Sequence, residues 1–361
     1  MTGATQKSGD ELKVAPAGKE PGGAGGGPRF WPRKRPDLAG LTASYGILVA
    51  WAVVILVFSL LEPERFPTTA NLQTILGSQS VLLILALGLI ISLSVGEYDL
   101  SVAGAMSVSL VLVGYLNVIA GWAIIPAVLA ALLSGVLVGL LNAFLVVGVG
   151  VESIVATLGT GTLLVGLGVA INGETTAGIS ESLVEVVRYK VLGLPMSFYY
   201  ALALTAIVWY CLRFTPLGRY LYFVGVNQSV ARLSGLPVNR IRAGALVVTS
   251  TIGALTGVVF AGTLASSDPN ISASFLLPAF AAAFLGSTAI TPGRFNAWGT
   301  FIAVYFLVTG ITGLQLLGLS GWIENVFYGA SLVIAVSLSK GAAKYQLYRR
   351  LRRTREGGEA G

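Results

Sequence analysis

Residues 215–242 read TPLGRYLYFVGVNQSVARLSGLPVNRIR and lie between long apolar segments on either side. Within this stretch, Asn227 is a suitable N-cap and residues 228–234 fit about two helical turns. Gly235 suits the left-handed position after a helix, and Pro237 prevents the helix from continuing. Because so short a helix is not stable alone in water, we expect it to rest on the membrane-embedded part of the chain or on a partner protein.

Arginines dominate the charge of this loop, which contains no acidic residue. A plain basic loop would explain the arginines, because basic residues are retained on the cytoplasmic side of a membrane. It would not explain a helix with both ends marked. The arginines in and beside the stretch are Arg213, Arg219, Arg232, Arg240 and Arg242.

The composition of the whole chain places it in a membrane. Of its 361 residues, 55% are hydrophobic and only 11% are charged, whereas soluble domains carry about 25% charged residues. The net charge of +7 is concentrated in the two tails and the basic loop, so it indicates contact with anionic lipid headgroups and not with nucleic acid. A single cysteine and the absence of histidine exclude an intrachain disulfide, a thiol-pair metal site and a histidine proton relay.

The two ends of the chain differ from its centre. Residues 1–37 mix Gly, Pro, Lys and Glu without apolar periodicity, which predicts a disordered basic tail and not a cleavable signal peptide. Residues 341–361 form a second basic tail. Both tails are predicted to be cytoplasmic, and the transmembrane domain between them, residues 38–340, contains the cytoplasmic loop 213–242.

An all-α, multi-pass fold with about ten transmembrane helices follows from the apolar segments, since one crossing needs about 20 apolar residues. Two cytoplasmic termini require an even number of crossings, which ten satisfies. The count also places Arg294 on the same side as the basic loop. The predicted spans lie near residues 41–61, 75–95, 101–119, 123–148, 153–172, 196–212, 243–264, 278–290, 298–317 and 321–339.

Two carboxylates interrupt the apolar run between the second and third spans. Glu97, Asp99 and Ser101 stand close together there. One interpretation is a cytoplasmic turn, in which Asp99 or Ser101 caps the third helix and Glu97 is solvated. The other is a broken helix near residues 96–101, in which Asp99 and Ser101 line a polar cavity or fix the break. The sequence leaves both open.

No feature of the chain indicates an enzyme. A phosphate-binding loop of the form G-x-x-x-x-G-K-[ST] is absent, so we expect no nucleotide to bind to this chain. The scattered carboxylates and hydroxyls lack a partner base for catalysis. We therefore expect a transport protein.

Four passages resemble the membrane-spanning permease subunits of ATP-binding-cassette (ABC) importers for sugars, a family that includes the ribose, xylose, arabinose and galactoside permeases. Residues 97–102 are similar to the family's acid-Leu-Ser-Val segment, and residues 154–160, with Thr157 and Thr160, match its Ala-Thr-Leu-Gly-Thr passage. Residues 215–235 give the most specific match, and residues 285–300 resemble the glycine-rich loop and the next helix. The likeness covers about residues 40–340.

The chain also departs from the family pattern at three places. Tyr98 stands where a small aliphatic residue is common, and Ala103 stands where glycine is usual. Thr291 and Pro292 replace a more glycine-rich turn. The first two positions lie near the expected translocation pathway, so they bear on the substrate class.

The resemblance implies a division of labour in a bacterial inner membrane. Two permeases, either two copies or this chain and a paralogue, would form the pathway, and an extracytoplasmic sugar-binding protein would deliver the substrate. Cytosolic ATPase subunits would bind the ATP, leaving this chain without a cofactor. Helix 228–234 would couple to the ATPase, with apolar contacts and arginines that pair with acidic groups. The residues that the resemblance assigns to coupling are Gly218, Arg219, Asn227, Val230, Ala231, Arg232, Leu233, Ser234 and Gly235, and those assigned to the pathway or the helix break are Glu97, Asp99, Ser101, Thr157 and Thr160.

Three other functions fit parts of the sequence. An ion-coupled secondary transporter of a small polar solute would need buried carboxylates near the midplane, for which Glu97 and Asp99 are the candidates. An ABC permease for nucleosides would share the coupling loop. A non-transporting membrane scaffold would need neither the loop nor a polar cavity.

Overall fold

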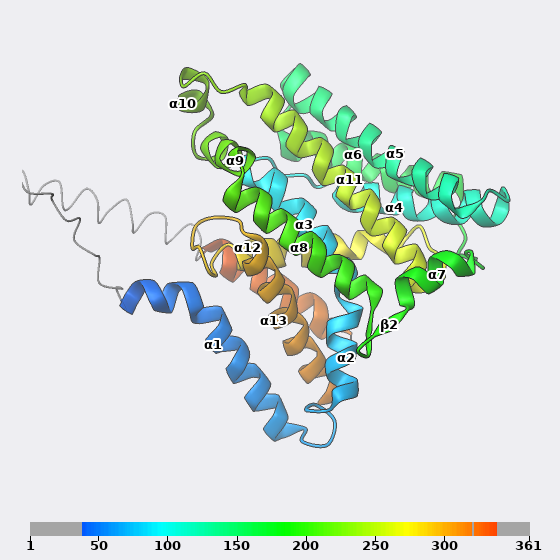
Figure 1. Ribbon diagram of the computed structural model, residues 1–361, viewed down its shortest axis with the longest axis vertical. Coiled ribbons are helices and arrows are strands. Elements are labelled where there is room, and N and C mark those ends of the chain that lie inside the picture. The colour runs from blue at the N-terminus through cyan, green and yellow to red at the C-terminus, as the bar shows by residue number, and fades with distance from the viewer. Residues whose placement is uncertain (1–37, 320, 338–361) are drawn as a thin grey trace, which may run out of the picture. The chain divides into compact units, whose positions relative to one another are not determined.

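The computed structural model describes residues 38–319 and 321–337, and these residues form a helical bundle (Figure 1). The predicted tails at 1–37 and 341–361 lie outside the described residues. Four strands of two residues each make two small antiparallel pairs. β1 (Thr176–Ala177) pairs with β4 (Ser266–Ser267), and β2 (Lys190–Val191) pairs with β3 (Leu194–Pro195).

Thirteen labelled α-helices make up most of the bundle. Two π-helical turns extend α4 and α5, and one 3₁₀ turn precedes α12; they are η1 (Tyr115–Ile119), η2 (Phe144–Val149) and η3 (Ser272–Phe275). The α-helices are α1 (Leu38–Leu61), α2 (Thr69–Ser78), α3 (Ser80–Ser94), α4 (Val102–Gly114), α5 (Ile124–Ala143), α6 (Ser153–Ile171), α7 (Glu181–Arg188), α8 (Met196–Phe214), α9 (Pro216–Val226), α10 (Gln228–Leu233), α11 (Val238–Leu264), α12 (Leu276–Gly286) and α13 (Ala297–Leu316).

Seven helical segments in the described part of the chain are long and apolar enough to cross a bilayer. This confirms a polytopic all-α membrane protein. Three further apolar helices, Tyr45–Leu61, Ser272–Gly286 and Trp322–Ser337, coincide with the other predicted spans but are shorter. Ten crossings therefore remain a prediction. The seven long segments are Thr69–Ser94, Val102–Ile119, Ile124–Val149, Ser153–Ile171, Met196–Phe214, Val238–Leu264 and Ala297–Leu316.

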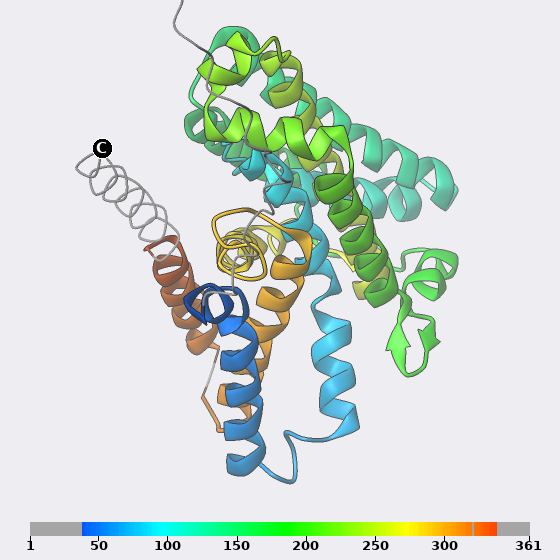
Figure 2. The ribbon, with the colours of Figure 1, turned by 60° about the vertical axis from the view of Figure 1, so that its left-hand side comes forward.

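Helices α3, α4 and α11 form the centre of the bundle. The middle of α3 is buried on every side, and α11 packs against α3, α4 and α5. α6 covers α4, while α12 packs between α3 and α13. α1 lies beside α13 (Figure 2, blue and orange). Gly139 allows close packing of α5 on α11, since a Cβ there would overlap the backbone of Val247.

The bundle has two distinct ends, which we name by their elements. The loop end carries α9, α10 and the start of α11, and the α7 end carries α7, β1 and β4 (Figure 1). α4 and α11 run side by side toward the α7 end, with Val102 of α4 level with Gly253 of α11. Gly253 lies 15 residues after Val238, so α4 begins about 22 Å along α11 at 1.5 Å per residue. The first turn of α4 therefore lies deep inside the bundle.

Candidate functional site at a helix break

The chain is not helical between Ser94, where α3 ends, and Val102, where α4 begins. This is where one of the two interpretations of the sequence places a broken helix. The intervening residues leave the loop end and re-enter the bundle, so their polar groups need partners inside the protein. We call residues 95–101 the break segment.

Asp99 is the centre of the polar contacts in the break segment. Its side chain is fully buried, and Oδ1 accepts the backbone N–H of Ser101 at 3.0 Å and the Ser101 hydroxyl at 2.6 Å. Oδ2 accepts the hydroxyl of Ser250, on α11, at 3.3 Å. Both carboxylate oxygens therefore have donors within the protein, which is the arrangement that makes a buried carboxylate tolerable.

A chain of side-chain hydrogen bonds continues from Asp99 to α5 and α6. The amide of Asn142, on α5, donates to Ser101 Oγ at 2.6 Å. The hydroxyl of Thr160, on α6, donates to Asn142 Oδ1 at 2.7 Å. Four elements are thereby joined, namely the break segment, α5, α6 and α11.

The backbone of the break segment is held by the first two turns of α6. The N–H of Tyr98 donates to Ser153 Oγ at 3.2 Å, and the N–H of Leu100 donates to Thr157 Oγ1 at 3.0 Å. Thr157 Oγ1 also donates to the carbonyl oxygen of Tyr98 at 2.9 Å. The structure thus brings together Asp99, Ser101, Thr157 and Thr160, which the sequence singled out.

Glu97 forms an ion pair with Arg242 of α11 and is 3% exposed. The interpretation in which Glu97 is solvated is therefore wrong for this structure. Capping by the Ser101 side chain is wrong as well, whereas Asp99 Oδ1 does accept the backbone N–H of Ser101. Ser101 occupies the N-cap position of α4, but its side chain makes no capping hydrogen bond, because Asp99 and Asn142 engage it instead.

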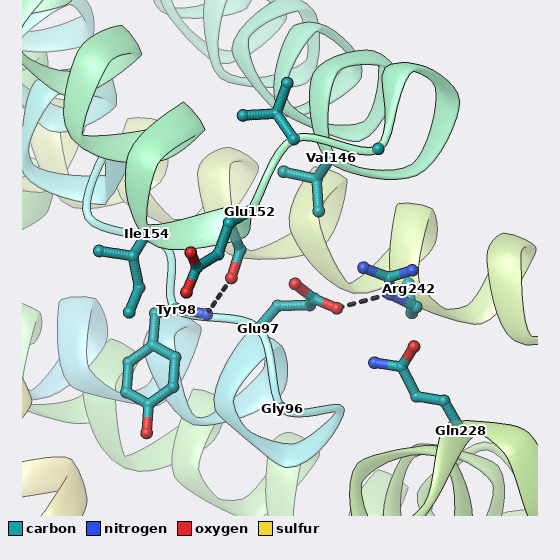
Figure 3. Close-up of a pocket in the computed structure, with 11 residues that line it drawn as sticks. Gly96, Glu97, Tyr98, Val146, Glu152, Ile154, Gln228 and Arg242 are labelled. Atoms are coloured by element: carbon teal, nitrogen blue, oxygen red, sulfur yellow. Dashed lines mark hydrogen bonds and ion pairs between the residues drawn. The ribbon is translucent and has the colours of Figure 1, made fainter.

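A pocket of about 340 Å³ opens at the loop end around this ion pair (Figure 3). Its walls come from the break segment, the loop between α5 and α6, the first residue of α10 and the start of α11. Figure 3 shows the carboxylate of Glu97 directed at the guanidinium of Arg242, with Gln228 beside them. The pocket therefore lies between the break segment and the basic loop. Its polar and charged side chains are Glu97, Tyr98, Glu152, Ser153, Gln228 and Arg242.

The short helix predicted in the basic loop is α10. Asn227 Oδ1 accepts the backbone N–H of Val230 at 3.0 Å, which is the expected N-cap bond. The helix ends at Leu233 instead of Ser234, which is the C-cap residue. Gly235 has φ +80°, the left-handed conformation that glycine adopts readily.

One face of α10 packs on the bundle and the other faces outward. Ala231 is 3% exposed and packs in a small apolar cluster with Val95 of the break segment and Val224 of α9. In contrast, Val230 is 57% exposed and Leu233 is 89% exposed. α10 is thus joined through Ala231 to the cluster that contains Val95, while its outward face has no partner among the residues that the structure describes.

The other residues predicted in the loop divide by exposure. Arg219, Arg232 and Ser234 are exposed, and Arg232 Nη2 donates to Asn239 Oδ1 at 3.3 Å. Gly218 is buried at the corner between α8 and α9, where a Cβ would overlap the backbone of Leu212. The structure thus gives Gly218 a packing role at this corner.

The family model described as branched-chain amino acid transport system / permease component matches residues 71–336. The chain belongs to this permease family.

The permease is similar to several curated importer subunits. It is 29% identical over 299 residues to the ribose import permease protein RbsC of Haemophilus influenzae, covering 80% of this chain and 90% of that protein. It is 31% identical over 295 residues to the ribose import permease of Escherichia coli, covering 80% and 91%. The autoinducer 2 import system permease protein LsrD of Salmonella paratyphi B is 28% identical over 292 residues, covering 78% and 86%. No solved structure matches the permease.

Several residues of the permease site are not among those that the sequence singled out. Asn142, Ser153 and Ser250 complete the polar contacts of the break segment, and they come from three different helices. Helix α9 is also unpredicted, although Pro216 at its first position is a signal for a helix start. The guanidinium carbon of Arg294 lies 3.6 Å from the ring centre of Tyr222 on α9. The loop that carries Arg294 and the basic loop, which the sequence places on one side of the membrane, are therefore in contact.

Proposed function

We propose that this permease forms the membrane pathway for a monosaccharide in an ATP-driven importer. Support comes from its relatives, whose names describe permeases for ribose, allose and autoinducer 2. The family membership over residues 71–336 supports a role as a transport subunit and not as an enzyme. ATP hydrolysis is assigned to a partner subunit, since the chain has no phosphate-binding loop.

The apolar cluster that α10 shares with the break segment carries the proposal. A cytosolic ATPase subunit would bind the outward face of α10, where Val230 and Leu233 are exposed and the exposed Arg232 could pair with an acidic group. Ala231 on the opposite face packs with Val95, so displacement of α10 would move the start of the break segment. The break segment leads directly into α4, whose first turn lies deep in the bundle. ATP binding and hydrolysis would thereby change the access of the pathway.

Asp99 is assigned a bracing role within this mechanism. Its two oxygens are occupied by Ser101 and Ser250, so it has little capacity left to hold a sugar hydroxyl. Its negative charge also lies before the first turn of α4, where the helix dipole favours an anion. Asp99 would keep α4 at its depth while the surrounding helices move. Ser101, Thr157 and Thr160 would complete this brace.

The basic loop supports an assignment of the permease's orientation in the membrane. We assign the loop end to the cytoplasm of a bacterial cell, because arginines are concentrated there, and both termini to the same side. The α7 end would then face outward and receive substrate from a sugar-binding protein. A second permease copy or a paralogue would complete the pathway.

Affinity purification of the full chain from its native membrane tests the proposal. We expect an ATPase with a nucleotide-binding loop to copurify, and to be lost on deletion of residues 228–234 or on Arg232→Glu. Arg240→Glu, on the same loop but outside α10, is the matched control. Reconstituted vesicles should then take up sugar only with ATP. A chain that purifies alone and transports sugar without ATP would establish an ion-coupled carrier instead.

A further inference from the structure

The charge at the loop end is not uniform. The exposed arginines of the basic loop, among them Arg219, Arg232 and Arg240, give this end a positive surface. Within the described part of the chain, the carboxylates that reach this end are Glu97 and Glu152, and both line the pocket beside α10. With Arg242 as the pocket's cation, two carboxylates face one guanidinium, which leaves one net negative charge in a positive surrounding.

Glu152 is the less constrained of the two carboxylates. It occupies the N-cap position of α6, yet its side chain makes no capping hydrogen bond. It is exposed and forms no ion pair with any residue in the described part of the chain. Figure 3 shows it beside Glu97 on the α6 side of the pocket. Within the described residues its carboxylate therefore has no cation partner, so it can accept one from elsewhere.

Glu97 has a second oxygen that no described residue engages. Arg242 Nε donates to Oε1, and no hydrogen bond within residues 45–319 and 321–337 reaches Oε2. A cationic side chain that entered the pocket would thus meet one free carboxylate and one free oxygen of an ion-paired carboxylate. Such a cation would compete with Arg242 for Glu97.

The position of the pocket identifies its occupant. Gln228 is the first residue of α10 and also lines the pocket, so a protein seated on Val230 and Leu233 would cover the opening. We propose that the pocket receives a lysine or arginine side chain of the ATPase subunit, which pairs with Glu152 and weakens the Glu97–Arg242 contact. This inference rests on the proposed function, because that function supplies the partner. Docking would then act on the break segment at two points, at Val95 through α10 and at Glu97 through the pocket.

Copurification of the ATPase with the full-length permease tests this inference, with Glu152→Gln and Glu152→Arg as the variants. Glu185→Arg is the matched control, because Glu185 is an exposed glutamate on α7 at the opposite end. We expect Glu152→Arg to lower the bound ATPase about tenfold, since like charges opposed across an interface disfavour association. Glu152→Gln should lower it less and should make the remaining association less sensitive to salt. Glu185→Arg should retain the wild-type amount.

A photo-crosslinking residue gives a second measurement that does not depend on affinity. Placed at Val149, which is exposed and precedes Gly150 of the pocket lining, it should crosslink to an ATPase peptide that contains lysine or arginine. Placed at Val186 on α7, it should not. If the wild type binds the ATPase and Glu152→Arg binds it equally at all salt concentrations, the pocket inference is overturned while the proposed function stands. If the wild type binds no ATPase, both are overturned.

Discussion

The break segment and α10 are both short interruptions between long apolar helices, and they are held in place in opposite ways. Asp99 in the break segment is fully buried and accepts three hydrogen bonds from side chains and backbone. α10 is held by one cap at Asn227 and one buried alanine, while Leu233 is almost fully exposed. Inside the membrane every polar group needs an internal partner, whereas at an aqueous surface water supplies it. The first region is therefore suited to rigidity and the second to binding.

Asp99 is where we expect the largest effect. Asp99→Leu leaves the Ser101 and Ser250 donors without an acceptor in a dry interior, and we expect a loss of about 3–5 kcal/mol of stability. Size-exclusion chromatography in detergent should show aggregated protein. Asp99→Asn keeps one acceptor oxygen for Ser101, so it should remain folded while sugar uptake falls sharply. Wild-type uptake by Asp99→Asn would contradict the bracing role.

Two substitutions on α10 should separate its two faces. Leu233→Asp changes an exposed residue, so the thermal stability of the isolated permease should not change, while copurification of the ATPase should be lost. Ala231→Asp buries an unpaired charge beside Val95 and should cost about 2–3 kcal/mol of stability. Thermal unfolding and ATPase copurification are measured for both variants. Equal effects on stability would refute the assignment of an inner and an outer face.

The N-cap of α10 should have an intermediate effect. Asn227→Ala removes the bond to the Val230 N–H and should destabilise α10 by about 1 kcal/mol, so that less ATPase copurifies. Asn227→Asp retains a capping oxygen and should bind nearly as much as the wild type. If the alanine and aspartate variants bind the same amount, the cap does not hold α10 for its partner.

Gly235 should give an effect no larger than that of the N-cap. Its φ of +80° costs an alanine about 1 kcal/mol, and a Cβ there would meet no other atom within 4 Å. Gly235→Ala should therefore lower ATPase copurification slightly, and Gly235→Asn should restore most of it, because Asn tolerates the left-handed region. A complete loss in Gly235→Ala would indicate a direct partner contact at this position.

Local signals made α10 predictable from the sequence. The stretch from its N-cap, Asn227, to its terminating glycine, Gly235, is nine residues long. No distant contact was therefore needed to define the two ends of the helix. Helix α9 was missed because Gly218 and Gly225 weaken a helical pattern. The structure shows what these glycines permit: Gly225 brings α9 against the backbone of Ser94, at the end of α3.

The contacts of the break segment were beyond prediction for a different reason. The sequence indicated that Asp99 and Glu97 are unusual in an apolar run, but it left their environment open. Their partners are distant, since Ser250 is 151 residues from Asp99 and Arg242 is 145 residues from Glu97. Nothing in the local pattern of α11 marks Ser250 as the donor. The sequence also did not establish the number of membrane crossings. One reason is that α12 is short and follows an irregular segment.

The distance in sequence between Asp99 and Ser250 also constrains how the chain is made. Asp99 leaves the ribosome 151 residues before its partner on α11, and Thr157, which binds Leu100, follows 57 residues after that leucine. Until α11 is synthesised, the Asp99 carboxylate has only the donors of Ser101, and its Oδ2 has none. We therefore expect the complete site to form only after α6 and α11 are made, and a nascent chain stopped before α11 should leave Oδ2 to water or to an insertion factor. The order of translation would thus decide when the second oxygen of this buried carboxylate gains its donor.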